Sequence, residues 1–545
     1  MATKRLIEKT RQRLKREIGT VYKPHAGRLR IALAFPNTYH VGMSNLGFQI
    51  VYRLMNDRED TVCERVFLPD PGDADGLLFT MESQTLVRDF DIIAFSLSYE
   101  LDYPNVLKIL SLSGLNEVAQ ERKKNDPLVI AGGPAATFNP ETLAPFMDAF
   151  VIGEAEEILP NLIDAIQEDV DFKKLANIEG VYVPRFYEPS YNDDGTIREV
   201  KAAPGVPERI CKRWVQNLDA YEATSAILTP ETEFSNMILA EVARGCGRQC
   251  RFCAAGFTYL PPRARKPEAV LDSIRKMEEK AAEHGLEHPR IGLLSASVFD
   301  HPSSLLICQS LLERDRLFSI SSTRADTLSR DVAEALHRGG HETLTIAPEA
   351  GSERLRLLIN KQISNEQIYD AVRTAWDGGF RRLKLYFMIG LPTETILDVA
   401  QIPKMVSEIA GMFAWEKVIV SVSCFVPKPW TPFQWAGMND ENTLKDKLSR
   451  IKTELKQVKR VSLTGESARE SVVQGVLARG DRRLKDALLI MNREESSWRG
   501  AFRKAGIDPH FYAQRVRGKD EIFPWDHIDL GVRKEYLWHQ YESAM

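Results

Sequence analysis

The sequence predicts an α/β protein with an N-terminal Rossmann-like (flavodoxin-like) parallel-sheet domain, a central partial (β/α)6 barrel and a small helical C-terminal domain. Residues 28–170 alternate short apolar runs with amphipathic segments, which is typical of a parallel sheet covered by helices on both faces. The alternation resumes with a stricter rhythm over residues 237–438. Residues 439–545 then become charged and helix-rich.

The first domain has five strand candidates, at Arg30 to Pro36, Val62 to Leu68, Asp91 to Tyr99, Leu128 to Gly132 and Ala149 to Gly153. Helix candidates separate them, at Leu46 to Met55, Tyr103 to Leu112 and Ala155 to Gln167. Sheets of this kind bind ligands at the carboxyl ends of their strands. Residues 1–27 precede the domain as a helical arm.

Residues 171–236 indicate a connector, in which the turn sequence Asn192 to Gly195 predicts a small hairpin. The barrel that follows has six strand candidates, at Met237 to Val242, Ile291 to Ser295, Phe318 to Ser322, Thr343 to Ala347, Leu383 to Met388 and Val418 to Ser423. Strand–helix alternations of this kind predict a site at the carboxyl ends of the barrel strands.

Composition limits the class of protein. A chain of 545 residues has room for about three or four domains, and 43% hydrophobic with 27% charged residues is typical of a globular protein. The net charge of −4 gives no global attraction to nucleic acid or anionic membranes. No run of 18 apolar residues predicts a membrane span, and the N-terminus lacks the apolar core of a secretory signal.

The N-terminal arm is basic, and two interpretations of it stay open. Either it is a solvated helical face, or it touches RNA or a membrane. The seven cysteines do not form a disulfide framework, because three of them are clustered. We therefore expect a cytoplasmic, reducing location.

The most informative motif is a CxxxCxxC run formed by Cys246, Cys250 and Cys253, directly after an apolar strand candidate. Three thiolates on one short loop can hold three irons of a cubane cluster and leave the fourth iron open to a small molecule. The nearest other cysteines, Cys211 and Cys308, lie far along the chain. The alternative is a zinc knuckle, which needs four closed ligands.

Residues 237–430 resemble the radical S-adenosylmethionine (radical SAM) enzymes. The resemblance is carried by the cysteine run with Phe252 before its last cysteine, and by the later segments Pro348 to Leu355 and Tyr386 to Glu394. The barrel is therefore expected to be of radical SAM type. The residues before it resemble cobalamin (B12)-binding domains, so residues 28–430 together look like the subclass with an N-terminal domain of that kind.

The resemblance implies a [4Fe-4S] cluster on the three cysteines and SAM on its open iron. Glu349 would accept hydrogen bonds from the ribose, or alternatively pair with Arg324. Ser295-Ala296-Ser297 stands where the family often has Gly-Gly-Glu for the methionine amine. The full set of SAM-binding candidates is Phe252, Ser295, Ser297, Arg324, Glu349, Ser352, Arg356, Gly390 and Pro392.

The cobalamin signature is DxHxxG, then a serine, then a glycine pair. Aligned on Gly42, the chain has Asn37 for the aspartate and Tyr39 for the cobalt-ligating histidine, with His40 one position away. We therefore expect a lower face without a histidine ligand, or a domain that no longer binds the cofactor. The candidates are Asn37, Tyr39, His40, Gly42, Ser96, Ser98, Gly132, Gly133, Gly153 and Glu154.

Methylation of an unactivated carbon is the leading reaction that this resemblance implies, with flavodoxin or ferredoxin as electron donor. Cyclisation or rearrangement is an alternative use of cobalamin. A second alternative is an enzyme without cobalamin that modifies RNA or protein, supported by the basic arm and the arginine-rich segment Arg479 to Arg483. A third is a non-catalytic sensor or electron carrier. His337 and His341, beside a helix-ending glycine pair, are predicted to be surface residues.

Overall fold

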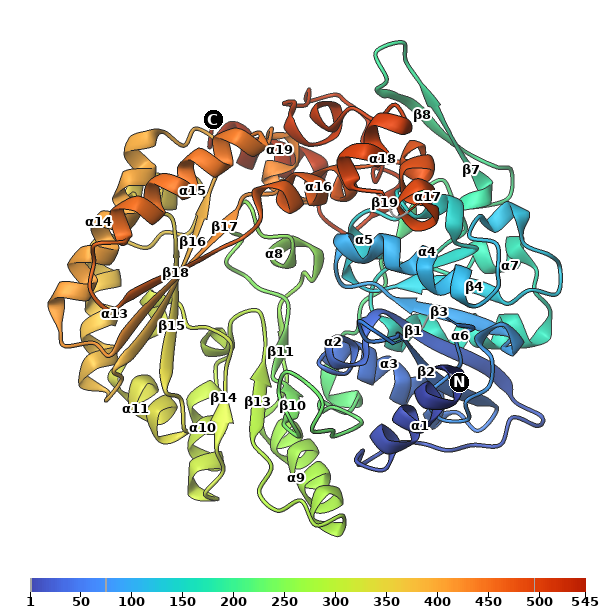
Figure 1. Cartoon of the computed structure of the whole chain (residues 1–545), viewed down its shortest axis with the longest axis horizontal. Helices are drawn as coiled ribbons and strands as arrows, with labels where there is room; N and C mark the ends of the chain where they lie inside the picture. The colour runs from blue at the N-terminus through green and yellow to red at the C-terminus, as the bar shows by residue number, and fades with distance from the viewer. Residues whose placement is uncertain (1, 74–75, 495) are drawn as a thin grey trace.

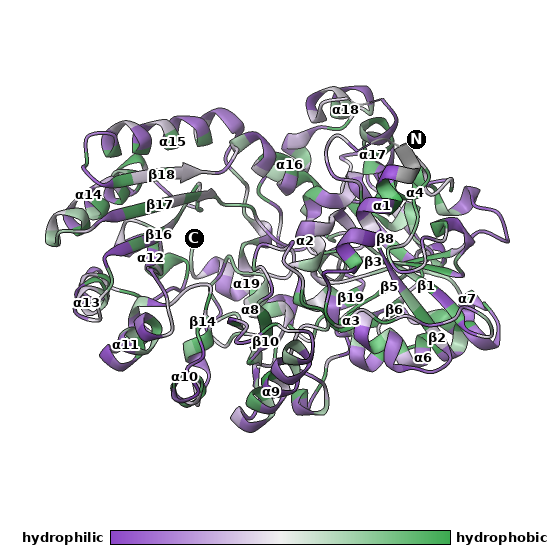
Figure 2. Cartoon of the chain, turned by 60° about the horizontal axis from the view of Figure 1, so that its bottom comes forward, coloured by the Kyte–Doolittle hydropathy of each residue, from purple (hydrophilic) through white to green (hydrophobic). Residues whose placement is uncertain are grey.

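The chain forms two large α/β bodies joined by C-terminal helices, in a computed structural model that describes residues 2–73, 76–494 and 496–545. Figure 1 shows the N-terminal sheet with its helices on one side and an open arc of strands with outer helices on the other. The last helices of the chain lie across the top of both. Figure 2 shows that hydrophobic residues follow the strands and the inner faces of the helices.

The N-terminal sheet has six strands in the order β2-β1-β3-β4-β5-β6, and only β6 runs antiparallel to its neighbour. The first five strands have the flavodoxin-like order, so that prediction is confirmed. The strands are β1 (Leu29–Thr38), β2 (Thr61–Leu68), β3 (Ile92–Ser96), β4 (Leu128–Gly132), β5 (Ala149–Val151) and β6 (Val181–Tyr182).

Helices cover both faces of this sheet because successive strand side chains point to opposite sides. Ile31 and Leu33 pack with one group of helices, while Ala32 and Ala34 belong to the core on the other face. The first face carries α3 (Leu46–Asp57) and α6 (Ala155–Glu168), and the second carries α4 (Tyr103–Leu112). Three short helices complete the domain, α2 (Tyr39–Met43), α5 (Pro134–Phe138) and α7 (Phe172–Ala176).

The basic arm forms helix α1 (Ala2–Leu14), and two of its cations, Lys9 and Arg13, face acidic residues of the same chain. Arg13 lies 2.5 Å from Asp70 and 2.8 Å from Glu231, and Lys9 lies 2.7 Å from Asp70. These cations are therefore engaged in holding the arm against the N-terminal domain.

The connector contains an antiparallel hairpin of β7 (Tyr187–Tyr191) and β8 (Ile197–Ala202). Gly195 supplies the left-handed residue of its turn, with φ +83°. A second pairing ties the connector to the far end of the chain, because β9 (Ile210–Cys211) runs parallel to β19 (Ile528–Asp529).

The barrel is an open arc of parallel strands in two sheets, β10-β13-β14 and β15-β16-β17-β18, linked by a bridge between Thr323 and Ile346. Its strands are β10 (Ile238–Glu241), β13 (Ile291–Leu294), β14 (Phe318–Ser319), β15 (Thr343–Glu349), β16 (Arg382–Ile389), β17 (Lys417–Cys424) and β18 (Val461–Gly465). The outer helices are α9 (Pro267–Glu283), α10 (Ser304–Glu313), α11 (Arg330–Arg338), α13 (Asn365–Asp377), α14 (Ile396–Met412) and α15 (Glu441–Leu455).

The arc has one strand more than the six that the sequence predicts. The additional strand, β18, pairs in parallel with β17 and lies within the range predicted to be a helical domain. Its sequence, Val-Ser-Leu-Thr-Gly, is short and only half-buried, as an edge strand usually is. That composition explains why the pattern of apolar runs did not reveal it.

His341 is half-buried rather than a surface residue as predicted, whereas His337 is exposed. The ring of His341 lies 3.0 Å from the backbone nitrogen of Ile320 and 2.9 Å from the carbonyl of Leu336. The imidazole thus joins β14 to the end of α11, which sequence position alone could not indicate.

The C-terminal helices are α16 (Ala468–Ala478), α17 (Lys485–Arg493), α18 (Trp498–Lys504) and α19 (Lys534–Glu542). The arginine-rich segment before α17 is directed inward. Arg479 is fully buried and donates to the carbonyl of Ala436, and Arg482 pairs with Glu141 of the N-terminal domain at 2.7 Å. Within the described residues, none of the helices has the length and apolar character needed to cross a membrane.

Candidate functional site

The three cysteines lie on a loop closed by a two-stranded stem at the carboxyl end of β10. The stem pairs β11 (Ala243–Arg244) with β12 (Arg263–Ala264) antiparallel, and Arg244 stands directly opposite Arg263. The short helix α8 (Ala255–Thr258) lies within the loop. Both ends of the cysteine loop are therefore fixed at one place.

Two residues of this loop have left-handed backbone conformations. Gly245 has φ +84°, and a Cβ there would lie 2.2 Å from the carbonyl oxygen of Tyr259. Gln249 has φ +53°, although it is not a glycine. Strained residues of this kind persist where the surroundings hold them, and they often mark functional loops.

The thiols are shielded from water. Cys250 is buried and the other two cysteines of the run are half-buried. Burial raises the pKa of the Cys250 thiol, although the charges of Lys361 and Arg324 act in the opposite direction. Burial also raises the pKa of Cys253 to about 11. Binding iron as thiolates would therefore release protons. Among the described residues, no three His, Cys, Asp or Glu side chains converge as ligands of one metal ion.

The outer side of the cysteine loop is held by the C-terminal helix α19. The Tyr536 hydroxyl donates to the side-chain oxygen of Gln249 at 2.6 Å, and Arg251 lies 3.2 Å from the Ser543 hydroxyl. Asn360 donates to the carbonyl of Gln249 at 3.0 Å. No role for the C-terminal segment could be predicted from its sequence, and these contacts show that it supports the loop.

Glu349 ends β15 with φ +70° and faces a cation that the sequence interpretation missed. Its carboxylate lies 3.0 Å from the ammonium group of Lys361. Arg324, the partner expected in the structural alternative, pairs instead with Asp326 at 2.8 Å. The Lys361 side chain is 7% exposed. In the sequence, the only signal that could have marked it as a site residue is its position after a helix, next to a polar residue.

Ser352 and Arg356 act on the backbone around the end of β15. Ser352 caps α12 (Glu353–Leu358) and donates to Asp398 at 2.6 Å. Arg356 is fully buried and donates to the carbonyls of Ala350 and Ile363. The structure thus places both side chains where they shape the loop after β15.

The remaining SAM candidates lie at the carboxyl ends of other barrel strands. Gly390 follows β16 with φ +83°, its N–H donates to Glu394 at 2.7 Å, and Pro392 continues the turn. Ser297 lies after β13, where its N–H donates to the Ser295 hydroxyl at 3.3 Å. Phe252 is half-buried and packs against the hydrophobic core.

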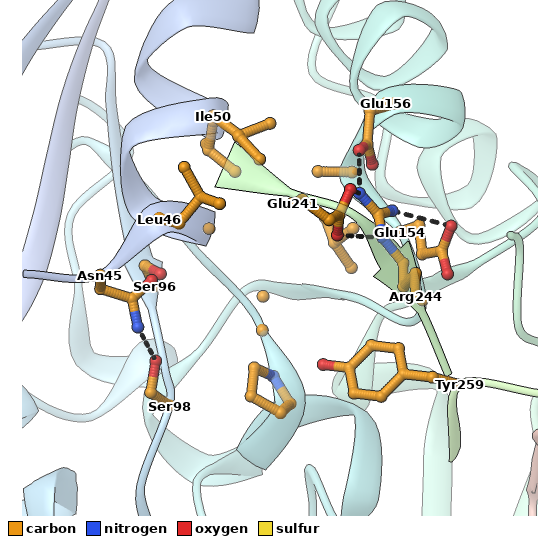
Figure 3. A pocket seen from close by; sticks show the side chains of 18 of the residues that line it. Asn45, Leu46, Ile50, Ser96, Ser98, Glu154, Glu156, Glu241, Arg244 and Tyr259 are labelled. Carbon is orange, nitrogen blue, oxygen red and sulfur yellow. Dashed lines mark hydrogen bonds and ion pairs between the residues drawn. The ribbon is translucent and has the colours of Figure 1, made fainter. Parts of the chain in front are cut away.

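A cavity of about 510 Å³ separates the N-terminal sheet from the cysteine loop (Figure 3). Its walls come from the middle of β1, from the carboxyl ends of β3, β4 and β5, from α3 and the start of α6, and from the segments around Arg244, Tyr259 and Ser295. Figure 3 shows the ring of Tyr259 pointing into it. Six of the residues predicted to bind cobalamin line this cavity, Ser96, Ser98, Gly132, Gly133, Gly153 and Glu154.

The other four cobalamin candidates lie outside this cavity lining. Tyr39 is buried, and its hydroxyl contacts Glu17 at 2.6 Å and Thr229 at 2.9 Å. His40 is exposed beside Glu233. The last two face elsewhere in the domain: the amide of Asn37 donates to Asp102, and a Cβ on Gly42 would meet Phe67.

The cavity wall nearest the cysteine loop is a buried group of ion pairs around Arg244. Its guanidinium lies 2.9 Å from Glu154, 2.8 Å from Glu156 and 2.9 Å from Glu241 (Figure 3). Burial raises the pKa of Glu241, but the charges of Arg244 and Arg265 outweigh it and leave that pKa below its ordinary value. Arg244 is thus a fixed part of the wall.

Comparisons with known proteins agree with this arrangement. A family model described as "Radical SAM proteins, N-terminal" matches residues 47–184, and one described as "Radical SAM superfamily" matches residues 240–406. The uncharacterized protein MJ0966 of Methanocaldococcus jannaschii is 30% identical over 460 residues, 84% of this chain and 90% of that protein. An uncharacterized methyltransferase of Pyrococcus horikoshii, PH0819, is 27% identical over 286 residues, 50% of this chain and 56% of that protein.

Among solved structures, the radical SAM methyltransferase TsrM of Kitasatospora setae, with cobalamin and a [4Fe-4S] cluster bound, has a TM-score of 0.48. It is 14% identical, and the match covers 72% of each chain. So distant a likeness supports no conclusion about ligands, whereas the two family models match in the order of the two α/β bodies. The chain therefore belongs to the radical SAM superfamily, and it is an enzyme whose cofactors include a [4Fe-4S] cluster and SAM.

Proposed function

We propose that this protein is a cobalamin-dependent radical SAM enzyme and that its reaction is methylation of an unactivated carbon. The observation that carries the proposal is the cavity that runs from the N-terminal sheet to the cysteine loop. A cofactor in that position would face the cluster across the same space. Two reactive groups must be held close together for transfer between them to be fast.

The three thiols suit a cubane with one open iron because they share one short loop, and the charges of Lys361 and Arg324 act on the thiol of Cys250. With both groups bound, a reduced cluster would supply the one electron that cleaves the SAM sulfonium to methionine and a 5′-deoxyadenosyl radical. We assign Glu349 to the ribose hydroxyls and Lys361 to the SAM carboxylate. Both side chains lie at the end of β15, 3.0 Å apart.

The chemistry of the cavity lining supports a corrinoid with its nucleotide tail as the occupant. The walls under the sheet are apolar, formed by Leu33, Ile50, Met55, Ile130 and Leu159, and suit an aromatic base. The end near the cysteine loop carries hydroxyl, carboxylate and guanidinium groups that suit amide side chains. When bound, cobalamin would supply the methyl group.

The chain offers no histidine to the cobalt among the described residues that line the cavity. Tyr39, which stands at the ligand position of the signature, is directed toward Glu17 and Thr229. His40 is exposed on the other side of the same short helix. These positions support a corrinoid whose lower face has no histidine ligand.

The cluster part of the proposal is tested by reconstituting the full chain anaerobically, reducing it and measuring 5′-deoxyadenosine released from SAM. Cys250→Ala should abolish release because one iron loses its thiolate. Cys211→Ala is the matched control, since Cys211 is exposed and away from the loop, and it should release the wild-type amount. Undiminished release by Cys250→Ala would remove the hypothesis.

The cobalamin part is tested by titrating hydroxocobalamin into the full chain and following its visible spectrum. A Cβ at Gly132 would lie 3.4 Å from the Cβ of Val151, so Gly132→Val narrows the cavity without a backbone clash. We expect affinity to fall about tenfold or more. Gly411→Val, on the outer helix α14 with nothing within 4 Å, is the control. Equal affinities for both variants would contradict the assignment of this cavity.

The alternative of RNA modification was supported by the basic N-terminal arm and the arginine-rich segment Arg479 to Arg483. In the structure, cations of both segments form ion pairs within the protein. Lys9 and Arg13 of the N-terminal arm pair with acidic residues, and Arg482 and Arg483 pair with Glu141 and Asp481. We therefore do not prefer it. Radical SAM enzymes require an electron donor, and we propose flavodoxin or ferredoxin for that role.

A further inference from the structure

Ion pairs attach the stem of the cysteine loop to the N-terminal domain, and one carboxylate of that domain contacts both strands of the stem. Glu154, which follows β5, lies 2.9 Å from the guanidinium of Arg244 and 2.6 Å from that of Arg263. These two arginines are opposite each other in the β11–β12 stem. One side chain of the N-terminal domain thus forms ion pairs with both ends of the loop that carries the cluster cysteines.

Glu154 itself has little freedom to move. It is buried, and its carboxylate also accepts a hydrogen bond from the backbone nitrogen of Val215 at 2.8 Å. The preceding residue, Gly153, has φ +116°, and a Cβ there would lie 2.1 Å from the carbonyl oxygen of Arg213. The close approach of these two segments therefore sets where the carboxylate lies.

The same carboxylate lines the cavity (Figure 3). Burial raises its pKa, but the hydrogen bond from Arg263 and the charge of Arg244 outweigh this, so the pKa lies below its ordinary value. The group is therefore an anion at neutral pH, with the cavity on one side and the loop stem on the other.

We propose that Glu154 is a positioning residue that couples the occupant of the cavity to the cluster, by fixing the stem of the cysteine loop against the cavity wall. The inference rests on the proposed function only in naming a corrinoid as the occupant. Coupling of this kind is reciprocal: if the loaded cysteine loop favours the bound corrinoid, the bound corrinoid favours the loaded loop to the same degree.

The test compares hydroxocobalamin affinity in cluster-free and cluster-loaded full-length protein. In the wild type, we expect cluster loading to change the dissociation constant by about fivefold or more. Glu154→Gln removes the anion but keeps the shape of the side chain, and it should make the two dissociation constants equal. If the ratio of the cluster-free to the cluster-loaded dissociation constant is the same in Glu154→Gln as in the wild type, the proposal is overturned.

Glu141→Gln is the matched control, because Glu141 also forms a buried ion pair between two parts of the chain, with Arg482 at 2.7 Å, and it does not contact the cysteine loop. It should keep the wild-type ratio. Glu154→Asp keeps the charge with a shorter reach and should restore part of the coupling. It also serves if Glu154→Gln does not fold. Loss of the ratio in both Glu154→Gln and Glu141→Gln would show a merely structural role and overturn the proposal.

If the wild type binds no hydroxocobalamin, the proposed function fails. The role of Glu154 in positioning the cysteine loop is then tested on the cluster alone. The readout is the electron paramagnetic resonance spectrum of the reduced cluster with SAM, in cobalamin-free protein. We expect Glu154→Gln to alter this spectrum and Glu141→Gln to leave it as in the wild type. Identical spectra for all three proteins would overturn the inference.

Discussion

At the scale of single residues, the buried charge of Lys361 is the feature that points most directly to the SAM site. Its ammonium group lies 3.0 Å from Glu349, and its charge is the main influence that lowers the pKa of Cys250 against the effect of burial. A buried cation between a carboxylate and the cluster loop is costly unless it serves a ligand or a fixed anion. Lys361 can serve both, because Glu349 is a fixed anion and SAM carries a carboxylate.

Replacing Lys361 by methionine removes this charge while keeping a side chain of similar length. We expect SAM affinity of the cluster-loaded protein to fall by about tenfold or more, since hydrogen bonds to charged groups contribute roughly 1.5–3 kcal/mol. Equilibrium dialysis with SAM measures the effect. Lys361→Arg keeps the charge and should bind more tightly than Lys361→Met. Unchanged affinity in Lys361→Met would remove Lys361 from the site.

His341 gives the protein a pH dependence of stability. Burial lowers its pKa from 6.5 to about 4, and the neutral ring accepts a hydrogen bond from the Ile320 N–H. The unfolded chain therefore binds a proton more readily than the folded one. The stabilisation is complete above pH 6.5 and is lost as the pH falls toward 4.

We expect the free energy of unfolding to fall between pH 7 and pH 4.5, with His341 contributing up to about 3 kcal/mol of that loss. Urea titrations at both pH values measure it. His341→Gln keeps a donor and an acceptor without titrating, so it should show a smaller loss over the same interval. An equal loss in wild type and variant would contradict the assignment to His341.

At the scale of elements, the β11–β12 stem decides where the cysteine loop lies. The stem is only two residues on each strand, so the loop depends on contacts at both ends and on its outer side. Glu154 holds the stem, and α19 with Asn360 holds the outer side. The turn at Gly245 brings the first cysteine back across Tyr259.

The turn makes a prediction within the loop. Gly245→Ala places a Cβ 2.2 Å from the carbonyl of Tyr259 at a φ of +84°, so the loop must shift. We expect fewer irons per chain after reconstitution and faster loss of cluster absorbance in air. Gly247→Ala is the control, because its nearest neighbour, Pro262, would be 3.6 Å away. Equal iron contents in both variants would show that the turn is not needed.

At the scale of the whole molecule, one hydrophobic core connects the two α/β bodies. A single cluster of buried residues includes Ala32 of the N-terminal sheet, Ile238 of the barrel and Trp525 near the end of the chain. The pairing of β9 with β19 and the ion pair of Glu141 with Arg482 tie the connector and the N-terminal domain to the C-terminal segment. The cavity is therefore formed by bodies that are packed together rather than loosely linked.

This continuity predicts that the chain unfolds as one unit. Calorimetry of the full-length cluster-free protein should show a single transition with equal calorimetric and van't Hoff enthalpies, because neither body keeps a complete core without the other. Substituting Glu141 by glutamine should lower the midpoint of that transition without splitting it. Two separated transitions would show that the bodies fold independently.

The sequence predicted the parts of the site that depend on local spacing. The cysteine run, the glycine pair at Gly132 and Gly133, and the strand-ending Glu349 all lie where apolar runs stop, and strand ends gather at one edge of a sheet. Lys361 and His341 were missed or misplaced because their roles come from partners far along the chain. Tyr39 was a candidate by alignment, yet its hydroxyl faces Glu17, a contact that no local pattern indicates.

By itself, the sequence determined the two α/β bodies and a loop of three thiols, because apolar periodicity and cysteine spacing are local properties of the chain. Only the tertiary structure decided which side chains share the space between those bodies. Arg244 could have been a solvent-exposed cation until Glu154, Glu156 and Glu241 were brought around it. Buried charges need partners, and partners from distant segments are chosen by packing rather than by sequence position.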